Sequence, residues 1–123
     1  MTRINCVPPG ELCGKHLVAE YRELPRVFAL VRAAIARRER PAHVDRYTLG
    51  KGHVRFFYTR LAWLTRRQAA LIAEMRRRGY SPSFGAPPLD GFPPEWCGDW
   101  VPDAEALRIN RERIAARMPK GRV

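Results

Sequence analysis

The sequence has few cysteines, no long apolar segment and no recognisable targeting signal, and each absence excludes a class of protein. Its three cysteines, Cys6, Cys13 and Cys97, include no CxxC pair. An odd number without a signal peptide predicts reduced thiols in the cytoplasm rather than a disulfide scaffold. The spacing of Cys6, Cys13 and His16 fits no familiar zinc site, so we expect no metal and no cofactor. No apolar run approaches bilayer-spanning length, which argues against an integral membrane protein.

Acidic residues are also scarce, with 12 Asp and Glu against 23 Lys and Arg and a formal net charge of +11. Most of the excess is arginine, which favours bidentate contacts with phosphate over diffuse positive charge. Nucleic acid is therefore the favoured partner, although a protein that is basic for no functional reason has the same composition. A chain of 123 residues can bury about two thirds of its unfolded surface, so we expect one domain spanning residues 1–123.

An amphipathic helix is predicted to begin near Gly14. Its apolar residues recur in steps of three and four and form a stripe for the core: Leu17, Tyr21, Leu24, Phe28, Val31 and Ile35. Pro25 lies inside this helix and removes the hydrogen bond to the Tyr21 carbonyl, which predicts a kink between Tyr21 and Arg26.

The same helix has a charged face. His16, Glu20 and Glu23 follow one line at spacings i, i+4 and i+7. Arg22 and Arg26 lie one turn apart on the flank of that line. Carboxylates beside arginines on a helix most often form salt bridges, and this is the simplest interpretation of Glu23 with Arg26 or Arg22.

Two further helices are predicted, which gives an all-α fold with three main helices joined by long loops. The second covers about His53–Arg78. Its arginines are interpreted as a solvated face, with a place beside bound DNA as the alternative for some of them: Arg60, Arg66, Arg67, Arg76, Arg77 and Arg78. The third covers about Asp103–Met118, with Leu107, Ile114 and Met118 facing inwards. Between them, residues 80–102 are rich in proline and glycine but carry five large apolar side chains, which predicts an ordered loop packed on the core.

The N-terminus carries a candidate nucleophile. Thr2 is small enough for removal of the initiator Met1 to be expected, which would expose the Thr2 α-amine. An α-amine has an unperturbed pKa of about 7.7–8.0, so part of it is neutral near pH 7. A neutral amine can attack a carbonyl carbon and form a Schiff base.

Several segments match a known enzyme family in their charged, proline and aromatic positions. The longest is AEYRELPRVF, residues 19–28. Shorter matches are Thr2–Asn5, His16–Leu17, Gly52–Val54, Phe56–Tyr58, Gln68 with Leu71–Glu74, Gly98–Asp99 and Val101–Pro102. On these segments, which span Thr2 to about Arg117, the chain resembles the T-even phage pyrimidine-dimer DNA glycosylase/AP-lyase family.

The resemblance implies a DNA-repair enzyme that excises pyrimidine dimers and cleaves the resulting abasic (AP) site by β-elimination. It implies that Thr2 and Glu23 are catalytic, with the N-terminal segment reaching into the active site. The resemblance also implies a set of DNA-binding residues, of which the last two come from matching the third helix to the family: Arg3, His16, Arg22, Arg26, Arg113 and Arg117. For His16, a satisfied helix histidine is an equal alternative. The expected partner is damaged double-stranded DNA, bound by a monomer without an obligate protein partner, in the cytoplasm and at the nucleoid.

The chain departs from the family near its C-terminal end. The phage enzyme continues into an aromatic tail associated with dimer recognition, whereas this sequence reads Met118–Val123 without it. We expect this difference to affect damage specificity more than the lyase chemistry. Two alternatives therefore remain: a glycosylase or AP lyase for a different lesion, and a non-catalytic basic protein that binds DNA through phosphates.

Overall fold

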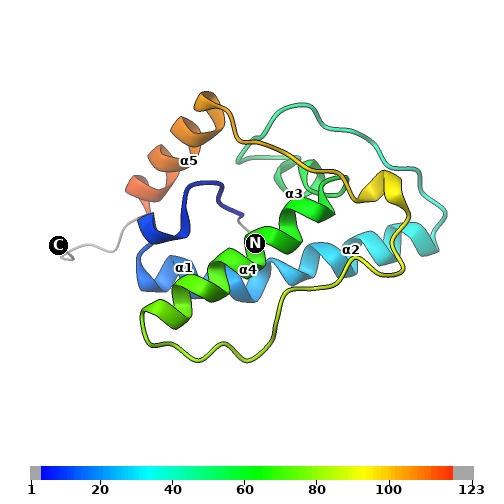
Figure 1. Cartoon of the computed structure of the whole chain (residues 1–123). Helices are drawn as coiled ribbons and strands as arrows, with labels where there is room; N and C mark the ends of the chain where they lie inside the picture. The colour runs from blue at the N-terminus through cyan, green and yellow to red at the C-terminus, as the bar shows by residue number, and fades with distance from the viewer. Residues whose placement is uncertain (1–3, 118–123) are drawn as a thin grey trace.

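The computed structural model describes residues 4–117, and within this range the chain forms helices and no β-strands (Figure 1). The helices are α1 (Gly14–Glu23), α2 (Pro25–Ala36), α3 (His53–Phe56), α4 (Leu61–Arg77) and α5 (Ala104–Ala116), with 3-10 turns η1 (Pro9–Glu11) and η2 (Pro94–Trp96). The predicted all-α class is confirmed. Among these helices none is both long enough and apolar enough to cross a membrane.

The kink predicted at Pro25 is confirmed, because the first helix is divided at Leu24 into α1 and α2. Pro25 has no N–H to donate to the Tyr21 carbonyl. The buried side chain of Gln68 in α4 takes its place, and its Nε2 donates to the Tyr21 oxygen at 3.0 Å. The kink therefore becomes the point at which α4 is tied to the first helix.

The second predicted helix is wrong as one continuous element, since α3 and α4 are separated by residues 57–60. The carbonyl of Thr59 turns away to accept from the N–H of Gly98 at 3.0 Å, and Arg60 forms an isolated β-bridge with Cys97. A Cβ at position 98 would lie 2.4 Å from the Thr59 oxygen, so only glycine permits this approach. The long-range contact with the loop thus outweighs the local helical pattern.

The solvated face predicted for the six arginines between residues 60 and 78 is wrong for two of them. Arg60 and Arg67 are buried, with relative exposures of 5% and 6%. The Arg60 guanidinium lies 3.8 Å from the centre of the Phe56 ring and donates to the Phe56 carbonyl at 2.6 Å. Arg67 forms a buried ion pair with Glu20 of α1. The helical spacing of residues predicts the direction in which each arginine points, but it does not show whether a buried partner such as Phe56 or Glu20 lies there.

The loop of residues 80–102 packs on the helices as predicted. Phe84 stacks on Tyr21 with ring centres 4.3 Å apart, while Phe92 and Trp96 are buried. Trp100 stacks on Tyr47, with ring centres 5.5 Å apart, and so joins this loop to the one between α2 and α3.

The inward face of α5 includes Leu107 and Ile114, which pack against the core as predicted, but two other residues are more deeply buried. Its buried residues are Ala106 and Asn110, whereas Leu107 and Ile114 are half-buried and Met118 lies outside the described residues. Figure 1 shows the N-terminal segment, in dark blue, between α5 and the crossing of α1 and α4. The burial of Asn110 follows from this arrangement, because the segment brings backbone N–H groups that need an acceptor.

Candidate functional site

A pocket of about 630 Å³ lies between α1 and α5, and we call it the α1–α5 pocket. It is lined by Asn5, Lys15, His16, Ala19, Glu20, Glu23, Arg113, Ile114 and Arg117. The α1 residues are spaced by three or four positions, which places them on one face of the helix. The pocket therefore brings the predicted charged face of α1, with His16 and the two glutamates, close to Arg113 and Arg117 at the end of α5.

Glu20 is the buried carboxylate of the pocket wall, with a relative exposure of 2%. Its two oxygens accept from Nε and Nη2 of Arg67 at 2.8 and 3.0 Å, and one also accepts from Asn5 Nδ2 at 2.8 Å. A bidentate guanidinium neutralises the carboxylate and fixes its orientation. Glu20 thus serves the architecture of the wall and adds little negative charge to the pocket.

Glu23 lies at the rim of the same pocket, at the last residue of α1. Its Oε2 is 3.0 Å from Nη1 of Arg26, and the two side chains are 31% and 67% exposed, respectively. The salt bridge predicted as the simplest role of Glu23 is therefore present. An ion pair this exposed adds little stability and leaves the carboxylate within reach of a ligand.

The structure brings most of the other predicted site residues to the same place. His16, Arg113 and Arg117 line the α1–α5 pocket, and Arg26 adjoins it through Glu23. Arg22 is exposed on α1 and is not part of the pocket lining. Thr2 and Arg3 lie outside the described residues.

Residues 6 and 7 of the N-terminal segment are held by Asn110 and Arg67, neither of which the sequence indicated as a site residue. Asn110 Oδ1 accepts from the N–H of Cys6 at 2.7 Å and from that of Val7 at 3.1 Å. Arg67 donates to the Val7 carbonyl. An asparagine in a helix interior is unfavourable unless its side chain has such a partner, and this is the one sequence signal that could have identified Asn110.

Residue 4 is held by a separate pair of side chains. The N–H of Ile4 donates to Nε2 of His53 at 2.8 Å, and the hydroxyl of Tyr47 donates to the Ile4 carbonyl at 2.9 Å. Asn5 follows directly and turns its side chain to Glu20 and Asn110. The backbone of the segment is thus anchored on both sides of the residue that lines the pocket.

The Cys6 thiol of the N-terminal segment is buried. Burial raises the pKa of the Cys6 thiol to about 12, so it stays protonated and unreactive at neutral pH. Among residues 4–117 no group of three or more His, Cys, Asp or Glu side chains is placed to hold a metal ion.

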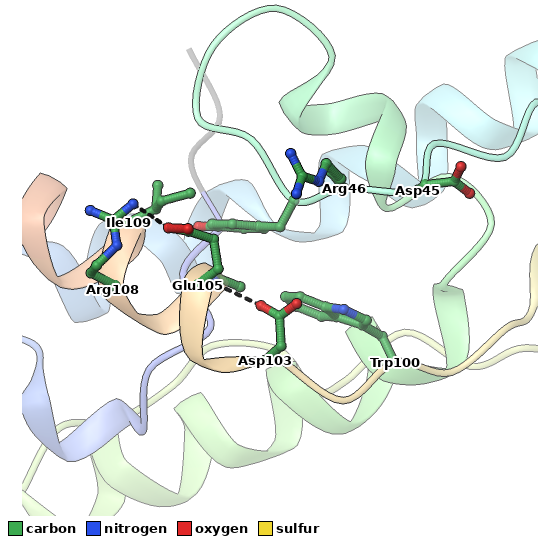
Figure 2. Close-up of a pocket in the computed structure, with 9 residues that line it drawn as sticks. Asp45, Arg46, Trp100, Asp103, Glu105, Arg108 and Ile109 are labelled. Atoms are coloured by element: carbon green, nitrogen blue, oxygen red, sulfur yellow. Dashed lines mark hydrogen bonds and ion pairs between the residues drawn. The ribbon is translucent and has the colours of Figure 1, made fainter.

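A second pocket, of about 290 Å³, lies at the other end of α5, and we call it the Trp100 pocket (Figure 2). Its charged side chains are Asp45, Arg46, Asp103, Glu105 and Arg108, and Tyr47 and Trp100 supply its aromatic surface. Figure 2 shows Glu105 turned towards Arg108, with which it forms an ion pair. Three carboxylates against two arginines make this pocket a poor site for a phosphate group.

The matching family model is that of pyrimidine dimer DNA glycosylase, and it covers residues 1–86. These residues include α1 to α4, and therefore the pocket residues from Asn5 to Glu23 and their buried partner Arg67. The pocket residues Arg113 of α5 and Arg117, which follows that helix, lie beyond the matched residues, so their place in the site rests on the geometry. With more than half of its 123 residues matched, the chain belongs to the pyrimidine dimer DNA glycosylase family.

Proposed function

We propose that this chain is a bifunctional pyrimidine-dimer DNA glycosylase and AP lyase that uses the α-amine of Thr2 as its nucleophile. The observation that carries the proposal is the convergence of Glu23 and the N-terminal segment on the α1–α5 pocket, which Asn5 lines beside Glu23. Only Arg3 and Ile4 lie between Thr2 and Asn5, so the Cα atoms of Thr2 and Asn5 are at most about 11 Å apart. Removal of Met1 would then expose an amine three positions before a residue of the pocket that Glu23 also lines.

In the glycosylase step, the lone pair of the amine forms a bond to C1′ of the damaged nucleotide. The glycosidic bond breaks, and the departing base takes the electron pair of that bond and the proton that the amine loses. The nitrogen lone pair then forms the C1′–N double bond as the bond between C1′ and the ring oxygen breaks. The ring oxygen takes up a proton from solvent, and a protonated imine between Thr2 and C1′ remains. Glu23 stabilises the cationic charge that develops at this carbon.

In the lyase step, the imine makes the C2′ hydrogen acidic, and Glu23 accepts that proton. The electron pair forms the C1′–C2′ enamine and then expels the 3′ phosphate as the C3′–O bond breaks. Water hydrolyses the remaining imine and returns the free amine. The same steps act on an abasic site once its aldehyde has condensed with the amine and released water.

The charges around the pocket support binding of the DNA backbone. Lys15, Arg113 and Arg117 are cationic, whereas the nearby Glu20 is neutralised by Arg67. Cationic side chains on two helices that face one pocket can contact phosphates on both sides of a lesion. Arg26, beside Glu23, extends this positive surface along α2.

Borohydride trapping on abasic duplex DNA tests the proposal, with mass spectrometry to locate the cross-link. We expect a covalent adduct at the Thr2 α-amine. Protein shown to begin at Thr2 that forms no adduct would contradict the amine mechanism. Matched duplexes carrying a cyclobutane dimer or an abasic site then separate a dimer glycosylase from a lyase for another lesion.

The non-catalytic alternative makes a different prediction for the same preparation. A protein that only binds phosphates gives salt-dependent retention of damaged and undamaged DNA, with no cleavage of either. Cleavage confined to the damaged strand would exclude that alternative.

A further inference from the structure

Ile4 is held by hydrogen bonds to its backbone in addition to the burial of its side chain. Ile4 is fully buried, and both polar groups of its backbone are bonded to side chains from the region between α2 and the end of α3. His53 accepts from the N–H at 2.8 Å, and Tyr47 donates to the carbonyl at 2.9 Å. Two hydrogen bonds on opposite sides of one residue fix the direction of the chain as well as its position.

The imidazole of His53 is itself fixed in one orientation. Its Nδ1 lies 2.7 Å from the Thr48 carbonyl, which can only accept, so Nδ1 carries the proton and Nε2 is left as the acceptor for Ile4. The rings of Tyr47 and Phe57 each meet the imidazole edge-to-face, with centres 5.6 Å apart. Gly52, immediately before it, has φ of 92°, which a residue with a side chain rarely adopts.

The hydroxyl of Tyr47 is held in a comparable way. Its ring is 7% exposed, stacks on Trp100 and meets Phe56 edge-to-face with centres 5.8 Å apart. The ring belongs to the wall of the Trp100 pocket, whereas the hydroxyl points to the segment that enters the α1–α5 pocket. The aromatic rings around Tyr47 and His53 thus hold the Tyr47 hydroxyl as a donor and His53 Nε2 as an acceptor for the backbone of Ile4, which lies two residues after Thr2.

We propose that Tyr47 and His53 are positioning residues that direct the Thr2 α-amine towards Glu23, an inference that rests on the proposed function. A nucleophile at a chain end loses reactivity when it samples many orientations, because few of them allow attack. Holding the chain two residues away raises its effective concentration at the reacting carbon. Neither side chain needs to contact DNA for this purpose.

The test measures the single-turnover rate of borohydride-trappable imine formation at saturating abasic DNA, together with the dissociation constant. Tyr47→Phe removes one hydroxyl and keeps the ring. We expect its rate to fall by roughly 10- to 100-fold with little change in affinity, because misplacement of about 1 Å can cost that much. Tyr21→Phe is the matched control, since the Tyr21 hydroxyl is equally engaged but bonds to the backbone of Phe84.

A second pair of variants tests the acceptor. His53→Gln retains an oxygen that can accept from the N–H of Ile4, whereas His53→Leu does not. We expect the glutamine variant to recover much of the rate that the leucine variant loses, at equal DNA affinity. A purely structural role would lower the thermal midpoint in both variants and leave the rate of the folded fraction unchanged.

The outcomes separate this inference from the proposed function. A wild-type protein without a Thr2 adduct overturns both. A wild-type adduct, with Tyr47→Phe and Tyr21→Phe trapping at equal rates, overturns only the positioning role. Should a variant fail to fold, amide hydrogen exchange on the wild-type protein tests the positioning role instead. If His53 holds the N–H of Ile4 firmly, that N–H exchanges as slowly as the backbone N–H groups of α4. Rapid exchange there would overturn the inference.

Discussion

The α1–α5 pocket and the Trp100 pocket lie at opposite ends of the same helix, yet they differ in chemistry. The α1–α5 pocket has Lys15, Arg113 and Arg117 in its walls, and its buried carboxylate is matched by a buried arginine. The Trp100 pocket has three carboxylates, and its arginine Arg108 is an exposed partner of Glu105 and Glu112. A net charge of +11 is thus distributed unevenly over the surface.

Local helix chemistry accounts for much of this difference. Asp103 caps α5 by accepting from the N–H of Ala106 at 2.8 Å, and Glu105 follows in the first turn. Acidic side chains stabilise the positive end of a helix dipole, and Arg113 in the last turn suits the negative end. A helix that satisfies its own termini therefore presents carboxylates to one pocket and arginines to the other. Only the second arrangement suits a DNA phosphate.

The largest effect that would test this comparison is expected from Glu23→Gln. Loss of a proton-transferring carboxylate should reduce strand cleavage by roughly 10²- to 10⁴-fold while leaving binding to abasic DNA largely intact. Glu105→Gln, in the Trp100 pocket, is the matched control and should cleave at the wild-type rate. Single-turnover cleavage and fluorescence anisotropy measure the two quantities. Wild-type turnover by Glu23→Gln would remove the catalytic role.

The next effect concerns stability, and it contrasts a buried ion pair with an exposed one. Arg67→Met leaves the Glu20 carboxylate without its guanidinium in a site where both side chains are at least 95% buried. Breaking a buried pair in this way costs about 3–5 kcal/mol in free energy of unfolding. Urea denaturation measures it.

The exposed pair supplies the control for this stability prediction. Arg108→Met removes the ion pairs with Glu105 and Glu112 at the surface. We expect its denaturation midpoint to match that of the wild type. Equal midpoints for Arg67→Met and Arg108→Met would contradict the structural role of the buried pair.

A smaller effect is expected on DNA affinity. Arg113→Ala and Arg117→Ala should each weaken binding to damaged duplex several-fold and lower the slope of log K against log salt by about 0.9. The same change is expected for Arg22→Ala and Arg26→Ala if the DNA follows the first helix. Arg46→Ala, in the Trp100 pocket, is the control and should alter neither quantity. The affinity of each variant is measured over a range of salt concentrations. An effect in Arg46→Ala alone would place the DNA at the Trp100 pocket and contradict the prediction.

Local features of the sequence predicted the all-α class, the start of α1 and the break at Pro25. The first two depend on the spacing of neighbouring residues, and the break depends on the N–H that Pro25 lacks. Prediction from local features failed where a distant group decides the outcome. The carbonyl of Thr59 accepts a hydrogen bond from the N–H of Gly98, which lies 39 positions further along the chain, and this contact keeps α3 and α4 from forming one continuous helix. No window of neighbouring residues contains both partners.

The site shows the same division between local and distant information. The spacing of His16, Glu20 and Glu23 predicts a shared helix face, and all three line one pocket. The hydrogen bonds of Asn110 to Cys6 and Val7 span more than 100 positions and have no counterpart in local spacing. Buried polar side chains such as Asn110 and Arg67 look like surface residues in a sequence until their partners are known.

The last prediction concerns the thiol of Cys6, on the N-terminal segment. Its thiol pKa is raised by burial from 9.0 to about 12, which lowers the thiolate fraction at neutral pH by about a thousandfold. We therefore expect iodoacetamide to label the partly exposed Cys13 of the folded protein much faster than Cys6. Mass spectrometry of quenched samples measures both rates, and labelling in urea serves as the control in which the two become similar.

The result bears directly on how firmly the N-terminal segment is held. Cys6 can react only when its hydrogen bonds to Asn110 and Ala106 open. Slow labelling that accelerates in an Asn110→Ala variant would identify Asn110 as the anchor of the segment. Equal labelling of Cys6 and Cys13 in the folded protein would mean that the segment opens readily. A nucleophile carried on so mobile a segment would gain little from the Tyr47 and His53 contacts, since the chain on both sides of Asn5 would then be loose.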